Sequence, residues 1–150
     1  MEESKYGKYF ITDTPRHPDH PQSRDLVSDL PWCDSLVIDK ELNGTVKGAY
    51  YLETCMMLRT GTMAGLEEHR HPFDEYVLFV GTNPEDQFDL GAEVEFWLGG
   101  EKHMVTKTCA VFCPAGIPHC PLVVHSLDRP FIFITTGNSL GYEHGEGADS

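Results

Sequence analysis

The feature that most constrains the fold of this chain is a series of short apolar runs separated by glycine, proline, asparagine and aspartate. Runs of this length with turn residues between them are typical of β-strands, and no amphipathic helix of three turns stands out among them. The predicted strands are Ser35–Asp39, Ala49–Arg59, Glu75–Val80, Ala92–Leu98, His103–Thr106, Thr108–Phe112, Leu122–His125 and Pro130–Thr135. Their spacing predicts an all-β sandwich or barrel of antiparallel strands.

The chain of 150 residues has the length of one domain. We expect an N-terminal arm and Pro/His-rich loop over residues 1–31, a barrel over 32–137 and a flexible acidic tail over 138–150. The aromatic stretch Tyr6–Ile11 suits either an edge strand or an arm that lies on a partner. Because prolines interrupt the segment that contains His17 and His20, these two histidines are interpreted as solvated loop residues.

Charge and cysteine content narrow the class of protein. Eleven basic and 24 acidic residues give a formal charge of −13, which disfavours binding to nucleic acid or to an anionic membrane. The first ten residues lack the apolar core of a signal peptide, and the five cysteines are odd in number and mostly lie in apolar runs. We therefore expect a cytoplasmic protein with buried thiols. A zinc site of Cys109, Cys113 and Cys120 is the less favoured alternative, because no C-x-x-C pair is present.

The stretch GLEEHRHPFDEYVLFVG, residues 65–81, carries His69, His71 and Glu75 at a spacing that suits a metal ion. In an extended strand alternate side chains share a face, so the two histidines lie about 6.6 Å apart along the backbone and can converge on one ion. The residues Pro72–Asp74 can form a turn that returns the Glu75 carboxylate to the same place.

A second segment, Pro114–His119, supplies a candidate for the fourth ligand. Its proline and glycine favour a tight turn that delivers His119 to the start of a strand. Three imidazoles and one carboxylate would leave two positions open on a six-coordinate divalent ion. Open positions distinguish a working metal site from a structural one.

These residues resemble the two sequence motifs of the cupin superfamily. The first, G-x5-H-x-H-x3-4-E-x6-G, matches His69-x-His71-x3-Glu75, and the second, G-x5-P-x-G-x2-H-x3-N, matches Pro114-x-Gly116-x2-His119. The flanking glycines depart from the pattern, and Val123 replaces the final asparagine. The resemblance implies a double-stranded β-helix, a jelly-roll barrel. It also implies that His69, His71, Glu75 and His119 bind one divalent transition metal per chain: Fe, Mn, Zn or Ni.

Three functions are compatible with such a site. The favoured one is a metal-dependent enzyme that acts on a small oxygen-rich substrate, a carboxylate, carbonyl or enol. It would use metal-stabilised enolate chemistry as a lyase, isomerase or decarboxylase, or dioxygenase chemistry. The others are a non-catalytic small-molecule-binding cupin, and a structural subunit whose metal site is closed by Cys120 or Asp74.

The candidate catalytic residues are Glu75, Tyr51, Glu53 and Arg59. Strand parity places the last three on one face of the strand Ala49–Arg59, but does not say which face is inside. An inward Arg59 would suit a substrate carboxylate, and an outward one would be a surface charge. Two residues of the strand Ala92–Leu98, Glu95 and Trp97, are further candidates for the cavity wall. The resemblance also implies a homodimer, to which the N-terminal aromatic arm and an apolar outer sheet would contribute.

Overall fold

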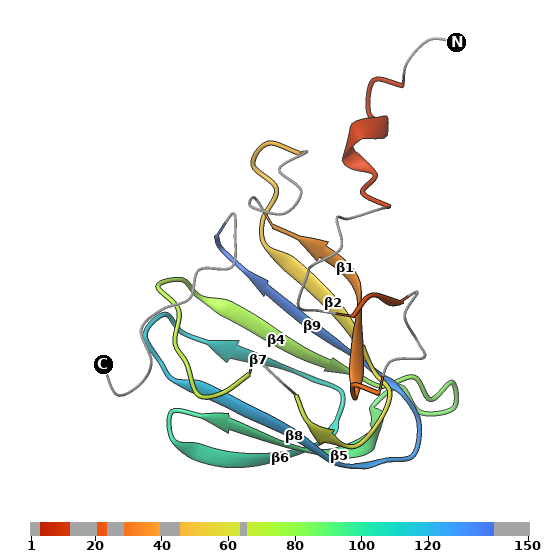
Figure 1. The fold of residues 1–150 in the computed structure, drawn as a ribbon, viewed down its shortest axis with the longest axis vertical. Coiled ribbons are helices and arrows are strands. Elements are labelled where there is room, and N and C mark those ends of the chain that lie inside the picture. Colours follow the sequence, from red (N-terminus) through yellow and green to blue (C-terminus); the bar gives the residue numbers. More distant parts are fainter. Residues whose placement is uncertain (1–3, 13–20, 24–28, 40–45, 64–65, 140–150) are drawn as a thin grey trace.

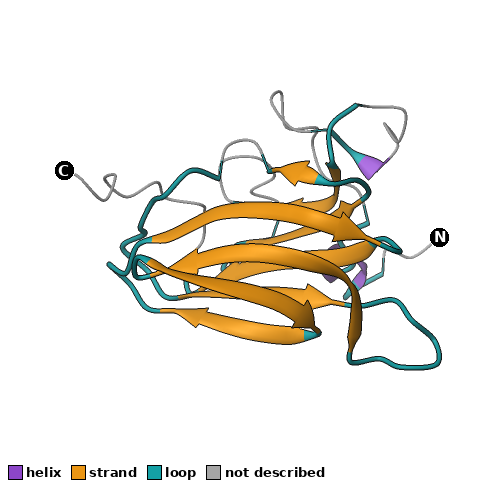
Figure 2. Ribbon diagram, turned by 90° about the horizontal axis from the view of Figure 1, so that it is seen from below, coloured by secondary structure: helices purple, strands orange, loops and turns teal. Residues whose placement is uncertain are grey.

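The computed structural model describes residues 4–12, 21–23, 29–39, 46–63 and 66–139. In this part of the chain two antiparallel sheets face each other, and the loops lie mainly at the ends of the strands (Figures 1 and 2). The elements are a 3-10 turn η1 (Gly7–Tyr9) and the strands β1 (Trp32–Ile38), β2 (Leu52–Met57), β3 (Gly61–Thr62), β4 (Glu75–Val80), β5 (Asp89–Leu98), β6 (Glu101–Lys107), β7 (Cys109–Cys113), β8 (His119–Leu127) and β9 (Phe131–Gly137).

The five-stranded sheet has the order β1-β2-β9-β4-β7, and the four-stranded sheet has the order β3-β8-β5-β6. Strands that are distant in the sequence thus become neighbours, as β9 does when it pairs with both β2 and β4. The predicted antiparallel barrel is confirmed, and every predicted strand overlaps an observed one. The two-residue strand β3 was not predicted. The edge-strand alternative for Tyr6–Ile11 is wrong, because this stretch contains the 3-10 turn η1.

The core lies between the two sheets and is made mainly by alternate residues of their strands. Phe79 on β4 is fully buried at 0% exposure, and its ring lies 5.4–6.3 Å, centroid to centroid, from three other aromatic rings. These rings belong to Phe96, Phe131 and Phe133. Aromatic pairs at such separations add to the stabilisation that burial provides. The cluster therefore joins β4, β5 and β9 across both sheets.

The structure decides which face of β2 is inside. Tyr51, Cys55 and Met57 are buried, whereas Leu52 and Met56 are only partly covered and lie on the outer face. On β5, Val94 and Phe96 are buried, and Glu95 with Trp97 lies on the opposite side. The expectation that Glu95 and Trp97 line the cavity is therefore wrong.

Several sequence predictions concern residues outside the described ranges. They are the loop histidines His17 and His20 and most of the predicted tail 138–150, of which only residues 138 and 139 are described. Within the described ranges, no helix has the length and apolarity needed to cross a lipid bilayer.

Replacement of Phe79 by alanine tests the aromatic cluster. Removing this buried ring should lower the free energy of unfolding by about 3–5 kcal/mol, because the core cannot close the resulting cavity. Urea unfolding monitored by circular dichroism measures the change. The matched control is Phe88→Ala in the loop before β5, where the side chain is 65% exposed and the effect should stay within about 0.5 kcal/mol. Equal effects of the two substitutions would contradict this packing.

Candidate metal centre

Two segments that are far apart in the sequence meet at one end of the barrel. The backbone of His69 pairs with that of His119, the first residue of β8, through N–H to O hydrogen bonds of 3.1 and 2.9 Å. A third backbone bond of 2.9 Å joins the Gly116 N–H to the His71 carbonyl. The turn predicted at Pro114–His119 therefore fixes the histidine-bearing loop as well as carrying a histidine of its own.

The three imidazoles face a common point. Their ring centroids are separated by 4.7 Å (His69–His71), 4.5 Å (His69–His119) and 5.0 Å (His71–His119). One nitrogen of each ring can be chosen so that all three nitrogens lie within 4.8 Å of one another. Such separations allow three rings to coordinate one ion. The structure thus brings these three sequence-predicted residues together.

Backbone carbonyls orient two of the rings. Nδ1 of His69 lies 2.6 Å from the Glu67 carbonyl oxygen, and Nδ1 of His119 lies 3.2 Å from the Ile117 carbonyl oxygen. A carbonyl oxygen only accepts, so in each of these bonds Nδ1 carries the proton and Nε2 keeps its lone pair. This is the arrangement in which histidine commonly binds a metal ion.

Glu75, the first residue of β4, completes the cluster. Its carboxylate oxygens lie 3.3 Å from Nε2 of His119 and 3.6 Å from Nε2 of His71, and all three side chains are at most 3% exposed. Two of these buried atoms, Nε2 of His119 and Oε2 of Glu75, make no hydrogen bond to any described residue. Buried polar atoms normally have a partner. A divalent cation would supply one for both, so the donor set fits a metal ion.

The electrostatic setting keeps the His69 ring neutral. Burial, together with the neighbouring imidazoles of His119 and His71, lowers the pKa of His69 to about 4 against the opposing hydrogen bond to the Glu67 carbonyl. At neutral pH its ring therefore offers a lone pair. Burial, together with the Glu75 carboxylate, raises the pKa of Cys113 to about 12 and raises the pKa of Cys120 as well. Burial therefore disfavours the thiolate form of both cysteines.

The aromatic side chain of Phe73 packs against the histidine cluster. Phe73 stacks on the His71 ring with a centroid distance of 4.8 Å and an interplanar angle of 12°. It lies against Gly137 of β9, where a Cβ atom would come within 2.6 Å of the Phe73 ring. Gly137 pairs with Glu75, so the absence of a side chain there makes room for Phe73 beside the carboxylate.

Asp74 holds the second segment from the outer side of the sheet. Its Oδ1 accepts a hydrogen bond of 2.9 Å from the Ala115 N–H, and its own N–H donates to Oδ1 of Asn138. Asp74 is thus a link between the two motif segments. The sequence predicted Asp74 as a turn residue or as a carboxylate in or next to the ligand set, but not as a link between the two segments.

Tyr51, which directly precedes β2, and Glu53 on β2 form a separate polar cluster with Cys55 and Asp34, the acid–thiol cluster. Sγ of Cys55 donates to Oδ1 of Asp34 over 3.0 Å and lies 3.3 Å from Oε1 of Glu53, and the Tyr51 hydroxyl bonds to Thr135. The Tyr51 ring packs on Phe73 at 6.2 Å, and Phe73 in turn packs on His71. Phe73 therefore stands between this cluster and the histidines.

Arg59 lies at the other end of the five-stranded sheet. Leu52 at the start of β2 pairs with Thr136, and Met57 at its end pairs with Phe131, whereas Glu75 pairs with Gly137. Arg59 is exposed and follows β2, roughly 26 Å along the strand direction from the row of Glu75. The register therefore does not bring Arg59 to the histidines.

Sequence reasoning missed two residues of this region, Phe73 and Asp34. Phe73 stands in the predicted turn between His71 and Glu75, where an aromatic residue among turn formers was a usable signal. Asp34 is 0% exposed although it is an acid within the run WCDSLVI of β1. A charged residue in an apolar run indicates a buried partner, but only the fold shows that the partners are on β2.

A scan of the sequence against protein-family models and a search among curated proteins find no match. Solved structures do match. An oxalate oxidase in complex with the substrate analogue glycolate aligns over 79% of this chain and 56% of its own, with 13% identity and a TM-score of 0.52. A sugar phosphate isomerase from a cupin superfamily, from Silicibacter pomeroyi, aligns over 84% of this chain and 70% of its own, with 13% identity and a TM-score of 0.50.

These likenesses identify the architecture as the cupin fold, which is the fold that the resemblance of the two motifs implied. At 13% identity they establish the fold alone, and the chain spans only about half the length of the oxalate oxidase. The fold and the cluster together define the class: a small cupin barrel with a candidate metal centre at one end.

Replacement of His119 by alanine tests the assignment of the ligands. The variant should lose stoichiometric metal, with a fall in affinity beyond the roughly 10–100-fold that outer-shell partners cause. The strands should persist, because His119 pairs with His69 through backbone atoms. Elemental analysis of the purified protein measures the metal, and His103→Ala, at an exposed position on β6, is the control. One metal ion per chain in His119→Ala would contradict the assignment.

The acid–thiol cluster predicts a dependence of stability on pH. Burial, followed by the nearby Asp34 carboxylate, raises the pKa of Glu53 well above its ordinary value of 4.5. Between the two pKa values the folded state therefore retains a proton that the unfolded state releases. The contribution of Glu53 to the free energy of unfolding is complete below about pH 4.5, and it is lost as the pH rises toward the pKa of the folded state. Glu53→Gln, which keeps the donor but cannot ionise, should lose less stability between pH 5 and 8 in urea unfolding. Equal pH slopes for both proteins would contradict the raised pKa.

Proposed function

We propose that this protein is a metal-dependent cupin enzyme that acts on a small oxygen-rich substrate, a carboxylate, carbonyl or enol. The observation that carries the proposal is the buried cluster of three imidazoles and one carboxylate. Two of its ligand atoms have no hydrogen-bond partner among the described residues. His69, His71, Glu75 and His119 would hold one divalent ion, with Fe, Mn, Zn and Ni all compatible with this donor set.

When bound, such an ion would stabilise negative charge that develops on a substrate oxygen, and a redox-active ion would also permit chemistry with dioxygen. The chain's own residues prepare the site for this role. The carbonyls of Glu67 and Ile117 hold two rings in one tautomer. The Phe73 ring stacks on the His71 ring and restricts its orientation. His69 is only partly buried, so we place the substrate entrance beside it.

The class of substrate follows from the donor set and is consistent with the fold's neighbours. A divalent ion with open positions prefers paired oxygen donors, which small carboxylates, carbonyls and enols offer. The similar oxalate oxidase structure holds glycolate, a small hydroxy acid. Lyase, isomerase, decarboxylase and dioxygenase reactions share this first binding step. The buried surroundings of the site would strengthen the binding of substrate oxygens to the ion.

In the proposed site Tyr51 and Glu53 do not touch the substrate, because they belong to the neighbouring acid–thiol cluster. Phe73 lies between the Tyr51 ring and the His71 ring, and burial raises the pKa of Glu53. Among the residues first considered for catalysis, Glu75 alone lies within the cluster of ligands. Because Glu75 would be a metal ligand, a different group, on the side of the site where the substrate binds, would act as the acid or base of the reaction.

The second candidate is a non-catalytic small-molecule-binding cupin. It would use the same four residues and the same open positions, so activity measurements must separate it from the enzyme. A structural subunit with a closed site is disfavoured. Asp74 is engaged with Ala115 and lines the outer face of the sheet, and the raised pKa of Cys120 disfavours the thiolate that a metal ligand needs.

Activity of the metal-loaded protein tests the proposal. Protein reconstituted separately with Fe(II), Mn(II), Zn(II) or Ni(II) is mixed with a panel of small hydroxy acids, keto acids and diketones. Proton exchange at carbon is followed in D2O by NMR, and oxygen uptake by an electrode. We expect turnover by at least one metal form with at least one compound, and a loss of at least about 100-fold in Glu75→Gln.

The matched control is Glu95→Gln, which removes a carboxylate from the outer face of the four-stranded sheet. Its activity should equal that of the wild type. Saturable binding of panel compounds without turnover by any metal form would contradict the enzyme and support the non-catalytic binder. Turnover that Glu75→Gln leaves unchanged would contradict the site.

A further inference from the structure

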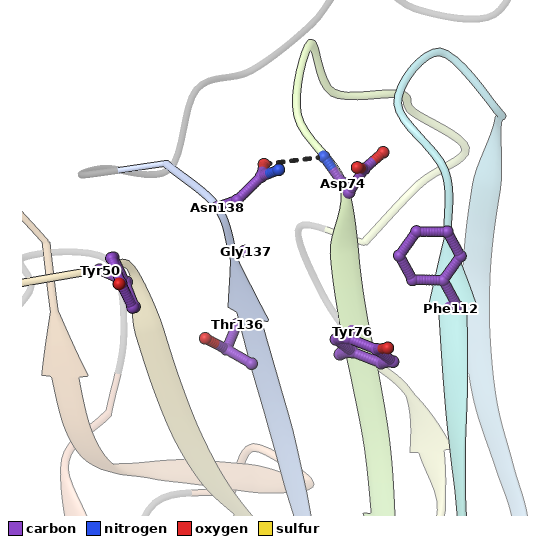
Figure 3. A pocket seen from close by; sticks show the side chains of 7 residues that line it. All are labelled: Tyr50, Asp74, Tyr76, Phe112, Thr136, Gly137 and Asn138. Atoms are coloured by element: carbon purple, nitrogen blue, oxygen red, sulfur yellow. Dashed lines mark hydrogen bonds between the residues drawn. The ribbon is translucent and has the colours of Figure 1, made fainter.

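A groove lies on the outer face of the five-stranded sheet, near the end at which β4 begins. Its volume is about 440 Å³, within the range of roughly 300–1,000 Å³ that is usual for small-molecule sites. Figure 3 shows Tyr50 on one side of β9 and Tyr76 with Phe112 on the other. Asp74 and Asn138 lie at one end. The residues that line the groove are Tyr50, Asp74, Tyr76, Phe112, Thr136, Gly137 and Asn138.

Three aromatic side chains form the walls of the groove and remain open to solvent. Tyr50, Tyr76 and Phe112 are 70%, 50% and 47% exposed. The Tyr76 and Phe112 rings are tilted by 58° and their centroids are 5.2 Å apart, so together they form a corner of two ring surfaces. Exposed apolar side chains that gather in one place, unlike scattered ones, are typical of a binding site.

The register of the sheet sets the width of the groove. Thr136 on β9 pairs with Leu52 on β2 and with Tyr76 on β4, so one strand separates the two walls. Tyr50 stands two residues before Leu52. With strands about 4.8 Å apart and residues about 3.3 Å apart, the Cα atoms of Tyr50 and Tyr76 lie on the order of 12 Å from each other. A group midway between them is about 6 Å from each, the distance within which an aromatic ring attracts a cation.

One carboxylate lies at the end of the groove. Among the described residues that line it, Asp74 alone carries a charge. Oδ1 of Asp74 accepts a hydrogen bond from the Ala115 N–H, and the Asp74 N–H donates to Oδ1 of Asn138, so the carboxylate is held in place. The formal charge of the whole chain is −13. Both the local and the overall charge attract cations and repel anions.

The aromatic walls discriminate between two kinds of cation. A primary ammonium group has three N–H donors, and each of them needs an acceptor when the group leaves water. The faces of aromatic rings offer poor acceptors for these donors. A quaternary ammonium group has no N–H donor, and the quadrupole of an aromatic ring attracts it. The groove therefore fits a quaternary ammonium group better than a primary one.

We propose that this groove is a binding site for a small quaternary ammonium compound. The methylated nitrogen lies over β9, between Tyr50 and the corner formed by Tyr76 and Phe112, and Asp74 supplies the opposite charge. Tyr76 is half exposed whereas Glu75 beside it is buried, so the groove and the candidate metal centre lie on opposite faces of the sheet. The proposal does not depend on the reaction proposed for the metal centre.

Binding of choline and of its uncharged analogue 3,3-dimethyl-1-butanol tests the proposal. The two compounds have nearly the same shape and the same hydroxyl group, so any contact of the hydroxyl with a metal ion is common to both. Each compound is titrated into the metal-loaded full chain at constant ionic strength, and isothermal titration calorimetry measures the dissociation constant. We expect saturable binding of choline, and a dissociation constant at least about tenfold higher for the uncharged analogue.

Two substitutions separate the groove from other places where choline could bind. Tyr76→Leu keeps an apolar side chain but removes the aromatic face, and Asp74→Asn removes the charge but keeps an oxygen that can accept from Ala115. Each should raise the dissociation constant of choline by about threefold or more and leave that of the uncharged analogue nearly unchanged. The matched control is Phe88→Leu, at an exposed position in the loop before β5, which should leave both constants unchanged. Circular dichroism confirms that the variants are folded.

Each of the other outcomes overturns the proposal. No saturable binding of choline up to about 50 mM would show that the groove holds no quaternary ammonium group. Equal binding of the uncharged analogue would show a site for apolar compounds. Choline binding that Tyr76→Leu and Asp74→Asn leave unchanged would place the ligand elsewhere in the molecule. Choline binding that weakens as the protein concentration rises would show that a second copy of the chain covers the groove.

Discussion

The structure depends on how a largely apolar barrel accommodates four polar ligand-type side chains at one end. His71, Glu75 and His119 are at most 3% exposed, and the removal of such groups from water costs several kcal/mol each unless a partner compensates. The backbone pairing of His69 with His119 brings the two loops together, and the carbonyls of Glu67 and Ile117 fix the rings. A divalent cation bound by the rings and the carboxylate would compensate this cost.

The support for this end of the barrel comes from residues that never touch the proposed ion. Gly137 leaves room for Phe73, Phe73 covers His71, and Asp74 ties the second motif segment to the first. Because β9 pairs with both β4 and β2, the same strand end also meets Tyr51. The candidate metal centre and Tyr51 therefore lie near the same end of the five-stranded sheet. A change at Gly137 is expected to affect both.

Much of the fold and the ligand set could be predicted from the sequence, because both rest on local signals. Turn residues marked the strands, and the spacing of His69, His71 and Glu75, with His119 after a Pro-x-Gly turn, indicated the cluster. The orientation of β2 could not be predicted, since a strand with apolar residues on both faces gives no preference. Arg59 and Tyr51 share a face, yet they lie at opposite ends of the sheet, and only the register reveals this. The contacts of the buried Asp34 could not be predicted either, because they depend on the pairing of β1 with β2.

X-ray absorption spectroscopy of the metal-loaded protein tests the proposed ligand set, because it reports the atoms that surround the ion. We expect a first shell of nitrogen and oxygen at about 2.0–2.2 Å with the multiple scattering of three imidazoles, from His69, His71 and His119 with Glu75. A shell containing sulfur at about 2.3 Å, or one without imidazole, would contradict it.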